Sequence, residues 1–297
     1  EARPMRINTN TAALNAQRNL GMSALSMQKA IERLSSGLRI NRAADDAAGL
    51  SISEKMRVEI RGLRQAVRNA QDGISLVQTA EGALNEVHGI LQRMNELALQ
   101  GANGTLATDD QKAIEAEMQQ LVEEINRIAN TTDFNGIKLF NGGGAGVTVE
   151  LQIGAGTSAA ERLSITVQGI SATDIGNAGG TGPASLDAAV TALGAAITGG
   201  TGVAQAFRDV VDSVAQAVKD VSDIRSGLGA YQNRLEHTIN NLNVAVENLS
   251  ASESRIRDAD MAEEVVAMTR AQILQQAGTA VLAQANQAPQ MVLSLLR

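Results

Sequence analysis

The chain has no cysteine and no tryptophan, and only Phe134, Phe140, Phe207 and Tyr231 are aromatic among its 297 residues. Without cysteine, a disulfide framework and a thiol nucleophile are both excluded. The shortage of aromatic rings leaves little on which nucleic-acid bases would stack. A hydrophobic core must therefore be built from Ala, Leu, Ile, Val and Met, a composition that suits closely spaced helices.

Long apolar runs are missing as well. No stretch approaches the roughly 18 apolar residues of a transmembrane helix, so none is predicted. The first residues, EARPMRINTN, contain no apolar segment typical of a cleaved secretory signal. Such a chain is expected in the cytosol unless it leaves the cell by a route that needs no cleaved signal.

Charge is scarce at both ends of the chain. Arg18 is the only charged residue in 7–28, and Arg270 and Arg297 are the only ones in 265–297. Both segments keep the apolar spacing of helices, whereas a soluble helix usually has a charged outer face. One chain offers little to cover both ends, so we expect other copies to cover them. Assembly, rather than catalysis, is the favoured interpretation.

The net charge of −7 is unevenly distributed. Residues 1–64 hold eleven Lys and Arg against six Asp and Glu, a balance of +5, and the remainder has a balance of −12. A basic N-terminal arm for nucleic acid is one interpretation. The basic residues are dispersed among helical apolar positions, so complementary contact between copies is the better one.

Three long seams of apolar residues predict helices that pack along their length. The first runs from Met56 to Ala98 in steps of three and four residues, about 65 Å of helix at ~1.5 Å per residue. Gly101 and Gly104 are expected to end it, and Thr108 with Asp109 to cap the next helix, which continues to Ile128. The third seam runs from Val211 to Leu249. We expect its members to pack against the first in a bundle.

Composition changes between residues 141 and 202, where glycine is frequent. Two alternating runs, 147–153 and 163–167, predict strands, and 187–197 predicts a short helix. We expect this stretch to be loop-rich and to face solvent, so that replacing residues 171–204 by a short linker would leave assembly intact. Helical spacing resumes at the C-terminus, where Pro289 is expected to kink or interrupt the last turns.

Signals for catalytic or metal chemistry are weak. His88 and His237 lie far apart and outside any HExxH pattern, and GGGAG at 142–146 lacks the lysine of a phosphate loop. Asp45 and Asp46 are adjacent carboxylates; a helix-start or junction role, paired with nearby arginines, fits them better than acid–base chemistry. Three short Asn-x-Ser/Thr matches begin at residues 103, 130 and 248 and carry little weight.

Several long motifs resemble bacterial flagellin. In the first half they are MRINTNTAALNAQRNL, IERLSSGLRINRAADDAAGLSISEKMR, NELALQGANGT and DFNGIKLF; in the second they are LGAYQNRLEHTINNL, ESRIRDADMAEE and QANQAPQMVLSLLR. They follow the family's order and cover about 5–140 and 207–297. The resemblance implies a mainly α protein: an elongated helical bundle or coiled coil from the N- and C-terminal segments, with a small β-hairpin region and a short Gly-rich variable insert.

The resemblance also implies a layout and a function. Residues 1–47 with 258–297 would form inner filament-core helices, 48–170 with 205–257 a helical bundle with a β-hairpin, and 171–204 a variable outer insert. The chain would be a structural subunit that self-assembles into the flagellar filament for swimming motility, with no catalytic residue, cofactor or metal. It would be exported unfolded through the flagellar type III apparatus and reside outside the cell in the flagellum.

Particular residues and partners follow from the same resemblance. The partners would be further copies, an export chaperone on the C-terminal segment, and the filament cap and hook-junction proteins, with neither nucleic acid nor membrane. Toll-like receptor five of animals would contact Arg93, Leu97 and Glu117. Two groups of packing residues are expected. Those that pack in the filament core are Ile7, Leu14, Leu274, Val281, Val292, Leu295 and Leu296. Those that form the seam of the bundle are Leu63, Val67, Leu84, Leu91, Leu235 and Leu242.

Three alternatives stay open at this stage. A hook–filament junction protein of the same superfamily would share the terminal helices. A metalloprotease-bearing flagellin would need an HExxH motif in the insert, which is absent. A free coiled-coil adaptor would not explain charge-poor segments at both ends.

Overall fold

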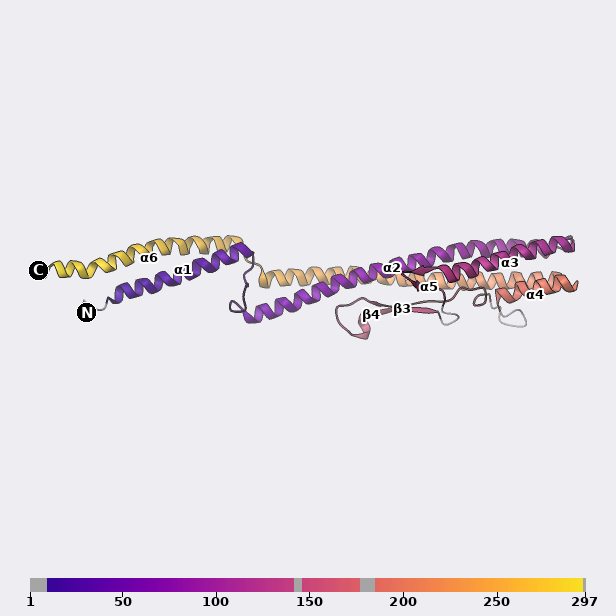
Figure 1. Ribbon diagram of the computed structural model, residues 1–297, viewed down its shortest axis with the longest axis horizontal. Coiled ribbons are helices and arrows are strands. Elements are labelled where there is room, and N and C mark those ends of the chain that lie inside the picture. Colours follow the sequence, from indigo (N-terminus) through magenta and orange to yellow (C-terminus); the bar gives the residue numbers. More distant parts are fainter. Residues whose placement is uncertain (1–9, 142–145, 177–184, 296–297) are drawn as a thin grey trace. The chain divides into compact units, whose positions relative to one another are not determined.

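Long helices dominate the computed structural model, which describes residues 10–141, 146–176 and 185–295, with side chains as far as residue 287. The α-helices of these ranges are α1 (Thr11–Ser36), α2 (Ala47–Gly101), α3 (Thr108–Thr131), α4 (Leu186–Gly199), α5 (Val203–Arg257) and α6 (Met261–Leu295) (Figure 1). The mainly helical class predicted from the sequence is confirmed.

Two short antiparallel strand pairs interrupt the helices. β1 (Asp133–Phe134) pairs with β2 (Ile137–Lys138), and β3 (Val147–Gln152) pairs with β4 (Arg162–Val167). The tip of the first pair is Asn135-Gly136, with φ of 51° and 82°, the left-handed conformation that a two-residue hairpin turn requires. The second pair follows the alternation of the sequence, since Leu163, Ile165 and Val167 all face the core.

The chain divides into two compact units. One contains residues 1–60 with 247–297, and the other contains residues 61–246. The larger core lies in the second unit, where the apolar faces of α2, α3 and α5 meet and fully bury Leu84, Leu91 and Met118.

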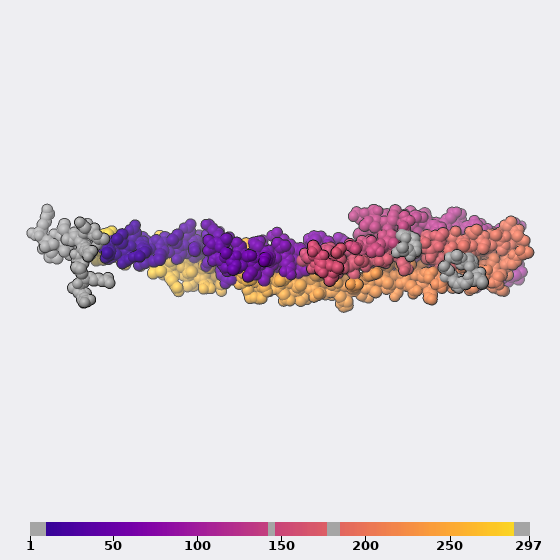
Figure 2. Space-filling model, turned by 90° about the horizontal axis from the view of Figure 1, so that it is seen from below, coloured from indigo at the N-terminus to yellow at the C-terminus, as the bar shows by residue number. Residues whose placement is uncertain are grey.

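Glycines let the elements of the second unit approach closely. A Cβ at Gly73 of α2 would collide with Leu151 of β3 and lie 3.3 Å from Leu235 Cδ1 of α5. A Cβ at Gly62 would lie 2.8 Å from that of Ala155, in the turn after β3. The hairpin therefore packs on α2 at two positions that carry no side chain. Figure 2 shows the surface of the hairpin segment, coloured for residues near 160, next to the purple surface of α2.

The ends of α2 and α3 follow local chemistry. α2 ends at Gly101 as expected, and a Cβ there would collide with the ring of Phe207. The predicted cap at Thr108 is wrong, because Thr108 is already the first helical residue. The Asp110 carboxylate instead accepts a hydrogen bond from the Ala107 N–H at 3.3 Å, which satisfies one of the free amides at the helix start.

The expectation that the glycine-rich stretch faces solvent is wrong for residues 186–199. These residues form α4, which packs on α3. Its Leu186 and Leu193 are fully buried, and Ile175 just upstream is 2% exposed. The short helix predicted at 187–197 is confirmed, but the sequence did not show that its apolar face completes the core.

The helix at the C-terminus is not interrupted where the sequence predicted. α6 continues through Pro289 to Leu295. A proline forfeits one backbone hydrogen bond but does not have to end a helix whose remaining residues keep helical dihedrals.

Candidate assembly surface

Small side chains bring α1 and α6 together in the first unit. The two helices pack along their length, and alanines lie at the contact: Ala16, Ala30 and Ala271 are at most 8% exposed. Gly278 of α6 faces Leu20 of α1, whose Cδ1 would lie 3.2 Å from an added Cβ. The pair therefore buries little apolar volume of its own.

A polar contact fixes the start of α1 against α6. The Asn10 side chain caps α1 by accepting from the Ala13 N–H at 3.1 Å. Its Nδ2 also donates to the Ala285 carbonyl of α6 at 2.7 Å. One side chain thus caps the start of α1 and contacts the backbone of α6.

Large apolar side chains cover the outward faces of both helices. Their exposed fractions run from 45% to 63%, and on each helix they recur along its length: Leu14, Met22, Leu25 and Ile31 on α1; Val265, Val266, Ile273, Leu274 and Val281 on α6. A shallow hollow of 430 Å³ lies on α6 between Val265, Val266 and Ile273. This many exposed large apolar side chains on one helix pair mark a candidate site of association.

The two linkers next to this helix pair are joined by backbone hydrogen bonds. Leu38 and Asp258 form an antiparallel bridge, flanked by Arg39 N–H donating to Arg257 O at 2.7 Å and Ala259 N–H donating to Gly37 O at 3.0 Å. Gly37 ends α1 in the left-handed conformation, at φ 71°. This turn directs the chain away from α1 and toward the bridge.

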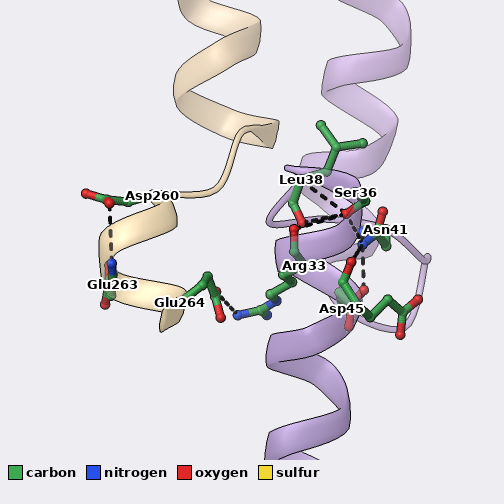
Figure 3. Close-up of polar contacts among 9 residues, drawn as sticks. Arg33, Ser36, Leu38, Asn41, Asp45, Asp260, Glu263 and Glu264 are labelled. Atoms are coloured by element: carbon green, nitrogen blue, oxygen red, sulfur yellow. Dashed lines mark hydrogen bonds and ion pairs between the residues drawn. The ribbon is translucent and has the colours of Figure 1, made fainter. Parts of the chain in front are cut away.

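Ionic contacts surround the bridge. Arg33 of α1 reaches Glu264 of α6 at 2.8 Å, and the Glu264 side chain is only 12% exposed (Figure 3). The Arg39 guanidinium donates to the Ile256 carbonyl at 2.6 Å, so a cation caps the carboxyl end of α5. Arg257 pairs with Glu54 of α2 at 2.5 Å.

Asp46 has the helix-start role, and Asp45 the junction role, that the sequence predicted as alternatives for this pair. Asp45 accepts from the Arg42 N–H at 3.1 Å and the Asn41 N–H at 3.3 Å. The bond from Arg42 is the main reason why the pKa of Asp45 lies below its usual value. Asp46 accepts from the Gly49 N–H at 2.9 Å and caps α2. The expected charge pairing differs, because the Arg42 guanidinium pairs with Glu32 instead, at 2.9 Å.

The predicted seam residues lie between α2 and α5 in the core. Leu84, Leu91 and Leu235 are fully buried, and Leu63 and Leu242 are 9% and 8% exposed. Val67 is half-buried. A cross-helix ion pair, Arg225 with Glu81 at 3.6 Å, lies on the same interface.

Of the three residues expected to contact the receptor, Arg93 and Glu117 lie on the surface and Leu97 lies in the core. Arg93 of α2 is exposed and binds Glu117 of α3 at 2.9 Å and Glu96 at 3.4 Å. Hydrogen bonding to Glu117 is the main cause that raises the pKa of Arg93. Leu97 is only 2% exposed and packs inward.

The terminal packing residues are only partly described. Leu14, Leu274 and Val281 are all more than half exposed on α1 and α6. Ile7 and Leu296 lie outside the described residues. Val292 and Leu295 belong to α6, but their side chains lie outside the described ones.

No catalytic arrangement appears in the part of the chain that the structure describes. There, no three His, Asp or Glu residues gather closely enough to hold a metal ion. No helix of these ranges is long and apolar enough to cross a membrane. His88 of α2 is half-buried and lies beside Gln92, with 3.1 Å between their Nε2 atoms.

Sequence reasoning missed the contacts that join the linkers. Arg33 and Glu264 are 231 positions apart, and Arg39 lies 217 positions from Ile256. No local spacing connects such residues. The one available signal was the cluster of charges in 29–46 and 253–264, each next to a charge-poor helix.

Comparisons with known proteins agree with this architecture. Residues 7–145 match the bacterial flagellin N-terminal helical region, and residues 211–296 match the C-terminal helical region. A flagellin of Halalkalibacterium halodurans is 55% identical, with 99% of this chain and 100% of that protein aligned. A flagellin of Bacillus subtilis is 50% identical over the same shares.

A solved structure supports the fold alone. A putative flagellar hook-associated protein from Vibrio parahaemolyticus aligns with a TM-score of 0.62, over 72% of this chain and 100% of that one. Its sequence is 16% identical.

Proposed function

The chain belongs to the bacterial flagellin family and is a subunit of the flagellar filament, and from this premise we propose that the α1–α6 pair carries the surface through which copies associate. The observation that supports the proposal is the row of large apolar side chains that nothing within the described unit covers. The filament is a homopolymer of such chains, located in the flagellum.

Burial of this row is large enough to drive association. Each large apolar side chain removed from water contributes about 1.5–3 kcal/mol. Ordering a residue costs about 1–2 kcal/mol of backbone entropy, so the helices alone are marginal and contact with neighbours is needed. On this proposal, residues 1–47 with 258–297 are the inner filament helices, 48–170 with 205–257 the surrounding bundle, and 171–204 the part placed outermost.

The test removes apolar area without disturbing the α1–α6 contact. Leu25→Ser with Ile273→Ser changes side chains that are 63% and 60% exposed, on the two helices. We expect the monomer to melt as the unchanged protein does, while seeded polymerisation is lost. Leu99→Ser, at a site 58% exposed on α2, is the matched control. Normal filaments from the double variant would refute the proposed surface.

The same apolar face suits an export chaperone before assembly. A chain that leaves through the flagellar type III apparatus unfolded needs its C-terminal apolar residues covered in the cytosol. Chaperone and neighbouring subunits would then compete for Leu274, Val281, Val292, Leu295 and Leu296. We further propose that the filament cap and the hook-junction proteins contact subunits at the two ends of the filament.

Toll-like receptor five is the proposed host partner of the second unit. The exposed Arg93–Glu117 pair would present both charges to the receptor, with Leu97 supporting α2 from within the core. Arg93→Ala should weaken receptor signalling by monomer, whereas Arg127→Ala, which removes a similar exposed pair with Glu124, should leave it unchanged.

A further inference from the structure

We propose that an arginine stripe on α2, formed by Arg61, Arg64 and Arg68, docks against an acidic stripe on α5 of a neighbouring copy. The proposal rests on the filament function above and adds a specific pair of contact surfaces in the unit of residues 61–246. It concerns side chains away from the apolar α1–α6 pair.

The arginine stripe is exposed, and it has no carboxylate partner among the residues that the structure describes. Steps of three and four residues place Arg61, Arg64 and Arg68 on one face of α2, and all three are exposed. Among the described residues, no carboxylate oxygen lies within 4.0 Å of their guanidinium groups. Arg57, one turn earlier, does have such partners in Glu54 and Glu253.

An acidic stripe follows α5 over a longer stretch than the arginine stripe, in steps of three, eight and three residues. Asp209, Asp212, Asp220 and Asp223 share one helical face, and Asp212 and Asp223 are exposed. Asp220 accepts hydrogen bonds from Gly176 N–H at 3.1 Å and from Gln216 at 2.8 Å. Within the described ranges, no lysine or arginine pairs with these four carboxylates at 4.0 Å or less. A hollow of 630 Å³ beside Asp220 and Asp223 also includes Asp174.

The two stripes cannot meet within one copy. α2 and α5 run antiparallel: Gly73 lies against Leu235, Gly101 against Phe207, and Glu81 pairs with Arg225. In this register, Arg64 at the centre of the arginine stripe lies far along the bundle from residue 216, the midpoint of the acidic stripe. At ~1.5 Å per residue, the centres of the stripes are about 40 Å apart along the helices. A neighbour displaced axially by about that distance brings them together.

A second copy is the partner that this arrangement fits. Each subunit presents both stripes, so one contact can repeat indefinitely through a filament of identical chains. The chain carries a net charge of −7, which makes copies repel one another at random contacts. Complementary stripes offset this repulsion only when two copies are displaced along each other by one particular distance. The stripes would therefore determine the axial register of neighbouring subunits more than the strength of their association.

The experiment compares seeded elongation by four full-length proteins: unchanged, R61E/R64E, D212K/D223K, and the quadruple variant with all four changes. Asp220 is left alone because it holds Gly176. Each double reversal places like charges opposite one another, and we expect elongation to fall at least about tenfold. The quadruple variant reverses the charge at two positions of each stripe and keeps the net charge, so the reversed positions again face opposite charges and we expect elongation to recover to within about threefold.

A charge-matched control separates loss of this contact from a general effect of changed net charge or stability. K55E/R234E makes the same change in charge as R61E/R64E at exposed cations outside the stripe, and should elongate normally. Circular dichroism melts of each monomer should coincide. Unimpaired double variants, or a quadruple variant that stays as slow as the doubles despite a native melt, would overturn the stripe contact. Neither result would bear on the proposal for the α1–α6 surface. That proposal is refuted only if L25S/I273S polymerises normally.

Discussion

At the scale of single residues, position in the core decides which changes the protein tolerates. Leu235 is fully buried, and its Cδ1 lies 3.3 Å from the Cβ position of Gly73 across the α2–α5 interface. An aspartate there would be a carboxylate without a partner in the core. Its neighbour Asn233 is exposed on the same helix.

Leu235→Asp should therefore destabilise the monomer by several kcal/mol and prevent filament formation. Asn233→Asp adds the same charge at the surface and should change stability by less than about 0.5 kcal/mol. Urea denaturation followed by circular dichroism measures both. A cooperative transition at the original midpoint for Leu235→Asp would show that the seam is misassigned.

The Asp45 carboxylate predicts a specific pH dependence. Hydrogen bonds from Arg42 and Asn41 lower its pKa in the folded state below the ordinary 3.8. A carboxylate whose pKa is lowered on folding stabilises the folded state at any pH above its unfolded pKa. This stabilisation is lost as the pH falls through the folded pKa. Asp45→Ala should thus reduce the urea midpoint at neutral pH, and the difference should vanish in strong acid. A difference independent of pH would contradict the role of the ionised carboxylate.

At the scale of elements, α4 shows that a short helix can be part of a core formed by distant segments. It packs on α3 through Leu186 and Leu193, which are fully buried, whereas its Thr191 is exposed. Replacement of the whole stretch 171–204 by a linker would remove α4 and uncover the face of α3 on which it packs.

Leu193→Ala should accordingly cost about 2–5 kcal/mol, the range for a buried leucine that leaves a cavity. Thr191→Ala on the exposed face serves as the control, with an effect within about 0.5 kcal/mol. Differential scanning calorimetry of both monomers makes the comparison. Equal melting temperatures would mean that α4 is a dispensable cover, as the composition alone had suggested.

At the scale of the whole molecule, stability differs between the two units. The unit of residues 61–246 buries leucines, methionines and phenylalanines, whereas the contact between α1 and α6 buries mainly alanines. Local opening is easier where few apolar contacts must be broken. The terminal helices should therefore gain most of their order from neighbouring copies.

Amide hydrogen exchange tests this difference. In the monomer, exchange should be fast in 7–28 and 265–297 and slow in the α2–α5 core, and it should become slow in both terminal segments after polymerisation. Leu295→Ser with Leu296→Ser should likewise weaken sedimentation of polymer far more than the thermal melt of monomer. Strong protection of the termini in the monomer would exclude order gained on assembly.

Heptad-like spacing determined much of this fold without reference to tertiary structure. The seam residues from Leu63 to Leu91 and from Leu228 to Leu242 are periodic over many turns, and a period of three and four residues is itself the pattern of a packed helix face. The family could likewise be identified from the sequence, because its motifs are long and follow one another in the order typical of the family. Asp45 and Asp46 next to a predicted helix start were enough to indicate a helix-start or junction role.

Tertiary structure alone decided the contacts that have no local pattern. Arg33 meets Glu264, Arg39 caps α5, and α4 closes the core on α3 because chain segments far apart in sequence are brought side by side. Leu97 shows the same limit, since only the packing of α2 reveals that its side chain points inward. The sequence showed only that positive charge is concentrated in residues 1–64 and negative charge in the remainder. The separation of the arginine and aspartate stripes along the bundle depends on the antiparallel register of α2 and α5. That register is set by long-range packing at Gly73 and Gly101, which no local spacing encodes.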